Sequence, residues 1–476
     1  MDNELRDPMD TVDYGVLSPA WAGTPAAATA SDVAFVQAML DVEAGWARVQ
    51  ADAGLCTPED AHAVANAARV ARYDLKLLAA KTPDGANALI PLLGMMRERL
   101  TEDNAPKSAG TALHRGATSQ DIIDSALMLV LSRTLRSTLA DLRSTARGLA
   151  ALAEEHRGTL CIARSLTQHA LPTTFGWKAA SWLSAVLSAE QQLSHTESQL
   201  SLQWGGAVGT LASLEQFLGD RPELNTGSAE LSTKLAEVLG LADAGTPWHT
   251  NRLPIVQAGS ALAACIAALG SFGADVLTAS RPEIGELSEP REAGKGGSSA
   301  MPQKQNPVRS VLLRNAAISA PGLAATLFAA AGSAVDERPD GGWHSEWSAL
   351  RELLRLASGA AHHAAALATG LTVNAPAMER NLKLGGDAIL SERLAMVLAP
   401  LVSGGKPAIQ ALVLRSLTDQ ISLRELLRLE ISSHDLTDEE LSELLDPAGY
   451  LGAADRFTTT VLADYSARKE LWQSHT

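Results

Sequence analysis

Apolar residues recur at helical spacing along most of this 476-residue chain. Residues 31–54 are a clear example, because a Ser-Asp cap precedes the apolar positions and Gly54 follows them. Longer amphipathic helices are predicted over 120–157, after Pro172, and over 254–286, 307–333 and 343–371. A helix of about 30 residues is roughly 45 Å long, which exceeds most globular helices. Several such helices joined by Gly- and Pro-rich loops predict an all-α fold, an elongated up-and-down bundle.

The composition supports packed helices rather than a β-sandwich. Hydrophobic residues make up 46% of the chain and aromatic residues only 4%, so the core is expected to be aliphatic. The long helices carry so much Ala and Leu that their exposed faces are expected to pack against other subunits. We expect three parts: an N-terminal helical domain (1–110), a central long-helix bundle (111–371) and a small C-terminal helical domain (372–476).

The formal net charge of −15 argues against a nucleic-acid groove, because phosphate neutralisation requires clustered Lys and Arg. It also means that an anionic ligand would need a local concentration of cations. Cys56, Cys161 and Cys265 are far apart and show no zinc or disulfide spacing, which favours a reduced cytoplasmic setting. The acidic N-terminus is unlike a signal peptide, and residues 255–279 are expected to form a buried helix rather than a membrane span.

The stretch GKGGSSAMPQKQNPVRS, residues 294–310, interrupts this helical pattern. A plain surface linker is one reading of it, because Gly/Ser loops are common. Linkers rarely place paired serines near a lysine and an asparagine, however. A serine beside a cation and backbone N–H groups can act as a base or nucleophile. Lys304 and Asn306 would then hold a carboxylate and stabilise the charge developing next to it.

Two further polar clusters precede long helices. In HRGATSQD, residues 114–121, Thr118 and Ser119 are either ordinary helix caps or anion-binding groups at a helix N-terminus. In ARSLTQHALPTTFG, residues 163–176, the groups suited to bind an acid are Arg164, Ser165, Gln168 and His169. If the loops converge at the ends of the bundle, the local positive charge comes from Arg115, Arg164 and Lys304.

Other catalytic motifs are missing from the sequence. It contains no HExxH, no CxxC, no dinucleotide-binding GxGxxG after a strand and no GxSxG elbow. The adjacent His362 and His363 face different sides of a helix, so they do not form a metal pair.

The three clusters together resemble the fumarase/aspartase superfamily over nearly the whole chain. GSSAMPQKQNP is similar to its signature loop, here 294–307. HRGATSQDIIDSALML, LTQHALPTTFGWKAA, LQWGGAVGTLASL, PWHTNR and GGWHSEWSALRELLRL resemble the 3-carboxy-cis,cis-muconate cycloisomerase branch, which includes enzymes similar to nitrosuccinate lyases. The resemblance implies a cofactor-free homotetramer with a twenty-helix core, whose active sites are each built from three subunits. It implies a small carboxylate substrate.

The resemblance also implies roles for individual residues. Ser298 matches the general base that removes a proton next to a carboxylate, and Lys304 and Asn306 match the groups that stabilise the resulting aci-carboxylate. The signature loop would close over the substrate as a lid. The residues expected to bind substrate are Arg115, Thr118, Ser119, Arg164, Ser165, Gln168, Ser299 and Met301.

Three positions depart from the pattern of the superfamily. Leu166 stands where fumarases and adenylosuccinate lyases carry a histidine, which leaves His114 and His169 as candidate acids. Gln303 and Gln305 stand where cycloisomerases usually carry His and Arg. These departures suit a leaving group that needs no protonation, such as nitrite. The sequence thus predicts a cycloisomerase-like enzyme, with a nitrosuccinate lyase and an inactive structural paralogue as alternatives.

Overall fold

The computed structural model of the chain describes residues 13–474, except residues 292–293, 295, 298–299 and 302. The chain divides into two compact units, and both are assembled from separate stretches of sequence. Unit 1 contains residues up to Arg143, Ser188–Gly270 and Leu312–Ala364, and unit 2 contains Ser144–Leu187, Ser271–Val311 and the residues from Ala365 onward. The domain boundaries expected at residues 110 and 371 stay predictions.

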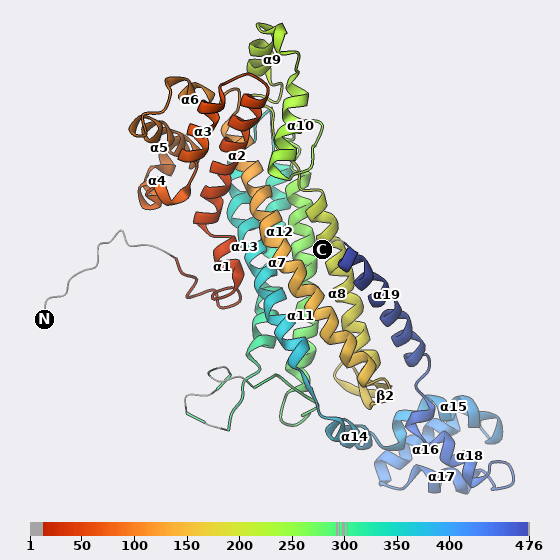
Figure 1. The fold of residues 1–476 in the computed structure, drawn as a ribbon. Helices are drawn as coiled ribbons and strands as arrows, with labels where there is room; N and C mark the ends of the chain where they lie inside the picture. The colour runs from red at the N-terminus through yellow and green to blue at the C-terminus, as the bar shows by residue number, and fades with distance from the viewer. Residues whose placement is uncertain (1–12, 292–293, 295, 298–299, 302, 475–476) are drawn as a thin grey trace, which may run out of the picture. The chain divides into compact units, whose positions relative to one another are not determined.

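Five long helices run through the bundle and belong partly to each unit (Figure 1). They are α7 (Ser119–Glu155), α8 (Phe175–Ser198), α11 (Leu253–Ala279), α12 (Val308–Gly332) and α13 (Gly341–Gly370). The helical periodicity predicted each of them. The prediction for α11 was wrong at its end, because the chain leaves the helix before Pro282, which cannot donate a backbone hydrogen bond. Ile284 and Gly285 instead bond back to the carbonyl of Arg281 in a turn.

Close contact between α7 and α13 depends on a glycine within unit 2. A Cβ atom placed on Gly148 would lie 2.7 Å from the backbone carbon of Ala368, which is too close for any side chain. In unit 1 the same two helices are joined by a hydrogen bond of 2.9 Å from the Trp343 indole to Asp124.

Unit 1 adds shorter helices around its part of the bundle. They are α1 (Pro25–Thr29), α2 (Asp32–Asp52), α3 (Pro58–Ala67), α4 (Leu75–Lys81), α5 (Leu89–Glu102), α6 (Lys107–Ala112), α9 (Ala212–Gly219) and α10 (Ser228–Leu239). The predicted cap of α2 is confirmed, since the Ser31 side chain accepts a hydrogen bond from the backbone N–H of Ala34.

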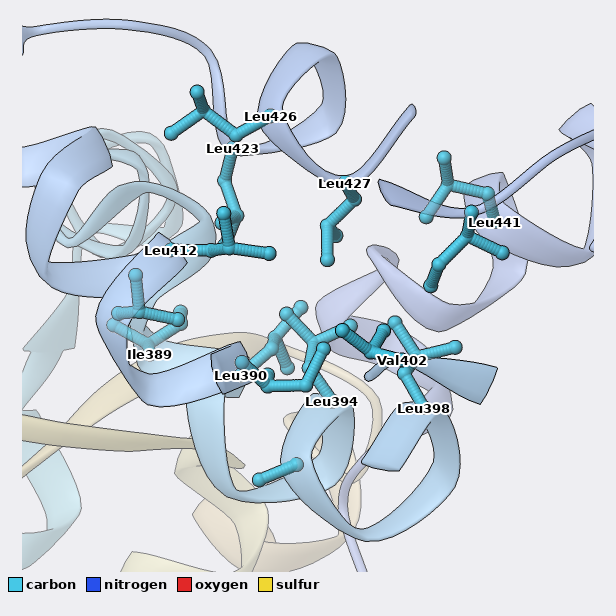
Figure 2. Packing of buried hydrophobic residues seen from close by; sticks show 14 of the residues in the cluster. Ile389, Leu390, Leu394, Leu398, Val402, Leu412, Leu423, Leu426, Leu427 and Leu441 are labelled. Atoms are coloured by element: carbon cyan, nitrogen blue, oxygen red, sulfur yellow. The ribbon is translucent and has the colours of Figure 1, made fainter. Parts of the chain in front are cut away.

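Unit 2 contains the strands and the C-terminal helices. The strands are β1 (Leu160–Ser165), β2 (Gln168–Thr174), β3 (Leu287–Ser288) and β4 (Thr372–Val373), and they pair antiparallel as β1–β2 and β3–β4. The helices are α14 (Ala375–Leu384), α15 (Ser391–Leu398), α16 (Gly405–Asp419), α17 (Leu423–Glu430), α18 (Asp438–Leu444) and α19 (Ala454–Ser474). Figure 2 shows the leucine-rich core of α15–α17, where Leu394 and Leu398 pack with Leu412 and Leu427.

Among the described helices, α11 and α12 are long and apolar enough to cross a bilayer. The most apolar window of α11 is 56% buried, as expected for a core helix of the bundle. The window of α12 is only 22% buried, so this helix leaves an apolar surface uncovered within a single chain.

Candidate active site

The first cluster of predicted residues lies at the start of α7 in unit 1. The fully buried Asp121 carboxylate accepts hydrogen bonds from the backbone N–H of Thr118 at 3.0 Å and from those of Gly205 and Gly206 at 2.9 Å. His249 Nε2 lies 3.0 Å from the same carboxylate. Asp121 therefore fixes the N-terminus of α7 against the Gly205-Gly206 segment. The side chains of Thr118 and Ser119 remain partly exposed.

The sequence reasoning missed Arg338, which contacts this cluster. Its guanidinium donates a hydrogen bond of 2.6 Å to the Thr118 hydroxyl and one of 3.3 Å to the carbonyl of Ala207. Arg338 precedes the GGWHSEW stretch but lies 220 residues from Thr118, so no local pattern revealed the pairing. It brings a positive charge to a predicted carboxylate-binding residue.

His114, a predicted candidate acid, is held by a buried glutamate. Its backbone N–H donates to one Glu43 oxygen at 3.0 Å, and its Nδ1 lies 2.7 Å from the other. The ring is 17% exposed while the Glu43 side chain is fully buried, and His114 adopts a left-handed φ of 60°. The carboxylate orients the imidazole by engaging one of its nitrogens. No local pattern revealed this pairing, because Glu43 and His114 are 71 residues apart in the sequence.

Arg115 is engaged by the fold. Its guanidinium donates a hydrogen bond of 2.6 Å to the carbonyl of Leu55 and lies 4.7 Å from the centre of the Phe217 ring. Burial lowers the pKa of the Arg115 guanidinium from its ordinary value. Its role in substrate binding stays a prediction, and its observed contacts are structural.

A buried ion cluster supports the α7 start from one side. Arg252 donates to Asp124 at 2.7 and 3.0 Å and to Glu346 at 2.6 Å, and these three side chains are at most 1% exposed. Burial raises the pKa of Glu346, and the Arg252 charge opposes that rise. The cluster therefore connects α7, the start of α11 and α13 through charges that are costly to separate.

The second cluster lies on the β1–β2 hairpin of unit 2. Leu166 and Thr167 form its two-residue tip with φ values of 50° and 71°, although neither is glycine. This backbone normally favours Asn-Gly, so the tip is strained. Leu166 is 93% exposed, and the predicted substrate-binding residues Ser165 and Gln168 and the candidate acid His169 are exposed beside it.

Arg164 anchors this hairpin. Its guanidinium makes a bidentate pair with Glu286 at 2.6 and 2.9 Å, and the amide of Asn381 donates to Glu286 at 2.7 Å. The hydrogen bonds that Arg164 donates to Glu286 raise the pKa of the Arg164 guanidinium, so its charge is permanent. Its predicted role in substrate binding is untested, and the observed contacts hold the hairpin in place.

The third cluster is the signature loop, also in unit 2, of which Ser298 and Ser299 lie outside the described residues. The buried Glu289 accepts hydrogen bonds from the backbone N–H groups of Arg309 and Ser310, which fixes the end of the loop on the N-terminus of α12. Gly296 has a φ of 72°, and a Cβ atom there would lie 2.8 Å from the carbonyl oxygen of Asn306.

Lys304 and Met301 are exposed in this loop, and Asn306 is half-buried. Lys304 has no carboxylate within ion-pair distance among the described residues. The backbone N–H of Asn306 donates to Gly296 at 2.7 Å, which folds the loop back on itself. The role of Lys304 in binding a carboxylate stays a prediction.

The described residues contain no cluster of three or more His, Cys, Asp or Glu side chains suited to hold a metal ion. The predicted site residues fall in both units: the group from His114 to Ser119 lies in unit 1, and the hairpin and loop groups lie in unit 2.

Comparisons with known proteins identify the family of the chain. A family model described as "Lyase" matches residues 24–322. The chain is 45% identical to the nitrosuccinate lyase of Streptomyces davaonensis, covering 93% of each chain. It is 40% identical to the 3-carboxy-cis,cis-muconate cycloisomerase of Pseudomonas aeruginosa, covering 93% of this chain and 95% of the relative.

Solved structures are similar over the same length. The 3-carboxy-cis,cis-muconate lactonizing enzyme of Pseudomonas putida superposes with a TM-score of 0.82 at 36% identity, covering 92% of this chain and 96% of the other. A fumarate lyase of Mesorhizobium has a TM-score of 0.79 at 30% identity, covering 92% and 97%. The chain therefore belongs to the lyase family, as an enzyme of the fumarase/aspartase superfamily in its cycloisomerase-like branch.

Proposed function

We propose that this enzyme eliminates nitrite from nitrosuccinate to give fumarate. The observation that carries the proposal is the 45% identity to a nitrosuccinate lyase over 93% of both chains. Leu166 at the hairpin tip and Gln303 and Gln305 in the signature loop agree with it, because none of these side chains is a strong proton donor.

In the proposed reaction, Ser298 removes a proton from the methylene carbon next to a carboxylate. The electron pair of that C–H bond forms the C=C bond of fumarate, and the C–N bond breaks with its electron pair leaving on nitrite. Lys304 and Asn306 stabilise the carboxylate while it carries the developing charge. Nitrite is a weak base, so it departs without a proton from the protein.

We assign the other substrate carboxylate to the start of α7. Thr118 and Ser119 are partly exposed there, and Arg338 supplies a cation at 2.6 Å from the Thr118 hydroxyl. The arrangement combines a helix N-terminus with a guanidinium group, and both favour anions.

The second candidate is cycloisomerisation of 3-carboxy-cis,cis-muconate, which the 40% identity to a cycloisomerase favours. The His114–Glu43 pair supports this candidate, because a proton-transfer group held at 2.7 Å is suited to a reaction that needs an acid. His169 is the alternative acid for the same reaction.

We infer that the enzyme is a homotetramer whose active sites are shared among three subunits. The exposed apolar residues of α12 support burial between subunits, since Val311 is 48%, Ile318 71% and Phe328 58% exposed in the single chain. Analytical ultracentrifugation checks this assignment, and a monomer at micromolar concentration would contradict it. We also infer a cytoplasmic location, because the three cysteines are free thiols.

A paired assay tests the proposed function. Purified protein is given nitrosuccinate, with fumarate and nitrite measured, and separately 3-carboxy-cis,cis-muconate, with its loss measured. Equal release of fumarate and nitrite supports the proposal, and consumption of carboxymuconate alone replaces it with the second candidate. Turnover of neither would favour a structural paralogue.

Substitutions in the signature loop, compared with a control substitution elsewhere, test the roles of Ser298 and Lys304. Ser298→Ala and Lys304→Met are expected to lower kcat at least a hundredfold with the assembly unchanged. Lys406→Met, at an exposed lysine of α16, is expected to behave as wild type. Full activity of Ser298→Ala would contradict its assignment as the base.

A further inference from the structure

A cavity of about 220 Å³ lies at the base of the β1–β2 hairpin, entirely within unit 2. It is lined by residues of β1, β2, the first turns of α8, β3 and α14, among them Cys161, Thr173, Lys178, Ser181, Leu287 and Met378. None of these six residues belongs to the proposed active site.

Lys178 gives the cavity its unbalanced charge. Arg164 and Glu286 also line it, but they neutralise each other in their bidentate pair. Lys178 has no carboxylate within ion-pair distance among the described residues. The Lys178 ammonium lies 5.9 Å from the centre of the Trp182 ring, which is the outer limit of a cation–π interaction. The cavity therefore has one net positive charge in a chain of net charge −15.

The remaining lining is divided between hydroxyl and apolar groups. Thr173 and Ser181 supply hydroxyls that can donate hydrogen bonds, and Leu287 and Met378 supply apolar surface. The volume is below the range of drug-sized pockets, so the occupant is a molecule of few atoms. We propose that this cavity binds a small monocarboxylate, with its carboxylate on Lys178 and its short apolar part against Leu287 and Met378.

This site is distinct from the hairpin tip. Cys161, Arg164 and Thr173 line the cavity, whereas the residues from Ser165 to His169 around the tip do not. A ligand at the base contacts the anchored end of the hairpin, while the exposed residues at the tip remain available.

Trifluoroacetate is a suitable probe, because it is a small monocarboxylate whose ¹⁹F line broadens when it binds a large protein. We expect saturable broadening with the wild type, and a Lys178→Arg variant should bind within about threefold of it. Lys178→Met should weaken binding roughly tenfold or more, as expected for loss of a charged hydrogen bond. Lys406→Met, at an exposed lysine of α16, is the matched control and should retain this binding.

A second variant guards against misfolding of Lys178→Met. Ser181 is exposed on α8, so Ser181→Phe should obstruct the cavity without entering the core, and it is expected to abolish the binding. Unchanged binding in Lys178→Met or in Ser181→Phe would overturn the proposal. Loss in Lys304→Met but not in Lys178→Met would also overturn it, because the probe would then occupy the active site. The measurement needs no turnover, so its outcome is independent of the proposed reaction.

Discussion

The buried cluster around Arg252 predicts a large and pH-dependent loss of stability when the arginine is replaced. Arg252→Leu removes one guanidinium that donates to both Asp124 and Glu346, at distances from 2.6 to 3.2 Å. Two carboxylates would then be buried without a cation. Breaking a buried ion pair by removing one partner typically costs about 3–5 kcal/mol. We take the upper half of that range, because one cation here serves two carboxylates.

The expected change in melting temperature follows from the size of the chain. An unfolding entropy of about 2.1 cal/mol/K per residue gives roughly 1 kcal/mol/K for 476 residues, so a loss of about 4–5 kcal/mol lowers the melting temperature by about 4–5 °C. Differential scanning calorimetry at pH 7.5 measures it. Arg48→Leu is the control, because the Arg48–Asp52 pair is 3.9 Å apart and about two-thirds exposed, and its loss should shift the melting temperature by less than 1 °C.

The pH dependence tests the electrostatic cause. The pKa of Glu346 is already raised by burial, and removing Arg252 would raise it further. A carboxyl group with a raised folded-state pKa binds more protons in the folded protein, so its stability contribution is present at low pH and is lost as the pH rises. The difference in melting temperature between wild type and Arg252→Leu should therefore be smaller at pH 5.5 than at pH 7.5. Adding Glu346→Gln should recover part of the loss. A melting temperature difference below 1 °C at pH 7.5, or a larger difference at pH 5.5, would refute this electrostatic explanation.

Three further predictions concern the hairpin, a helix cap and the start of α7. Replacing Leu166-Thr167 by Asn-Gly should relieve the left-handed backbone strain and stabilise the protein by about 1 kcal/mol, measured as a higher melting temperature. A lower melting temperature would contradict the inference that the hairpin tip is strained. Asp60→Asn should cost about 1 kcal/mol of unfolding free energy at pH 7, because hydrogen bonds of the α3 cap are lost. The pKa of Asp60 is lowered in the folded protein, so the difference from wild type should disappear as the pH falls and the wild-type carboxylate is protonated; a difference that does not change with pH would argue against this. Arg338→Met should raise KM for the dicarboxylate substrate roughly tenfold, with a smaller change in kcat. The control Arg48→Met should leave KM unchanged. An unchanged KM in Arg338→Met would show that Arg338 does not bind the substrate.

The sequence predicted the elements whose causes are local. The helix expected over 343–371 is observed as Gly341–Gly370, because its apolar spacing and flanking glycines are visible in the residues themselves. The β1–β2 hairpin was not predicted, since its tip lacks the usual Asn-Gly. Its anchor is the pairing of Arg164 with Glu286, 122 residues away. Arg338 was missed for the same reason, because its hydrogen bond to Thr118 crosses 220 residues.

The candidate site shows the same division between local and distant causes. The paired serines, Lys304 and Asn306 could be recognised as a set because they lie within nine residues of one another. The glutamate that orients His114 could not, because Glu43 resembles any charged residue on a helix until the fold shows that its side chain is buried.

Four cations of this acidic chain form two groups with different surroundings, and the groups predict different effects of mutation. Arg252 and Arg164 are paired with buried carboxylates, so neutralising either one leaves an uncompensated charge inside the protein. Lys178 and Lys304 face no described carboxylate, so neutralising either one leaves no such charge. Substitution of the arginines should therefore lower the melting temperature, whereas substitution of the lysines should weaken anion binding at an almost constant melting temperature. If the lysine variants melted several degrees lower with anion binding intact, the unpaired ammonium groups would be structural and both binding assignments would fail.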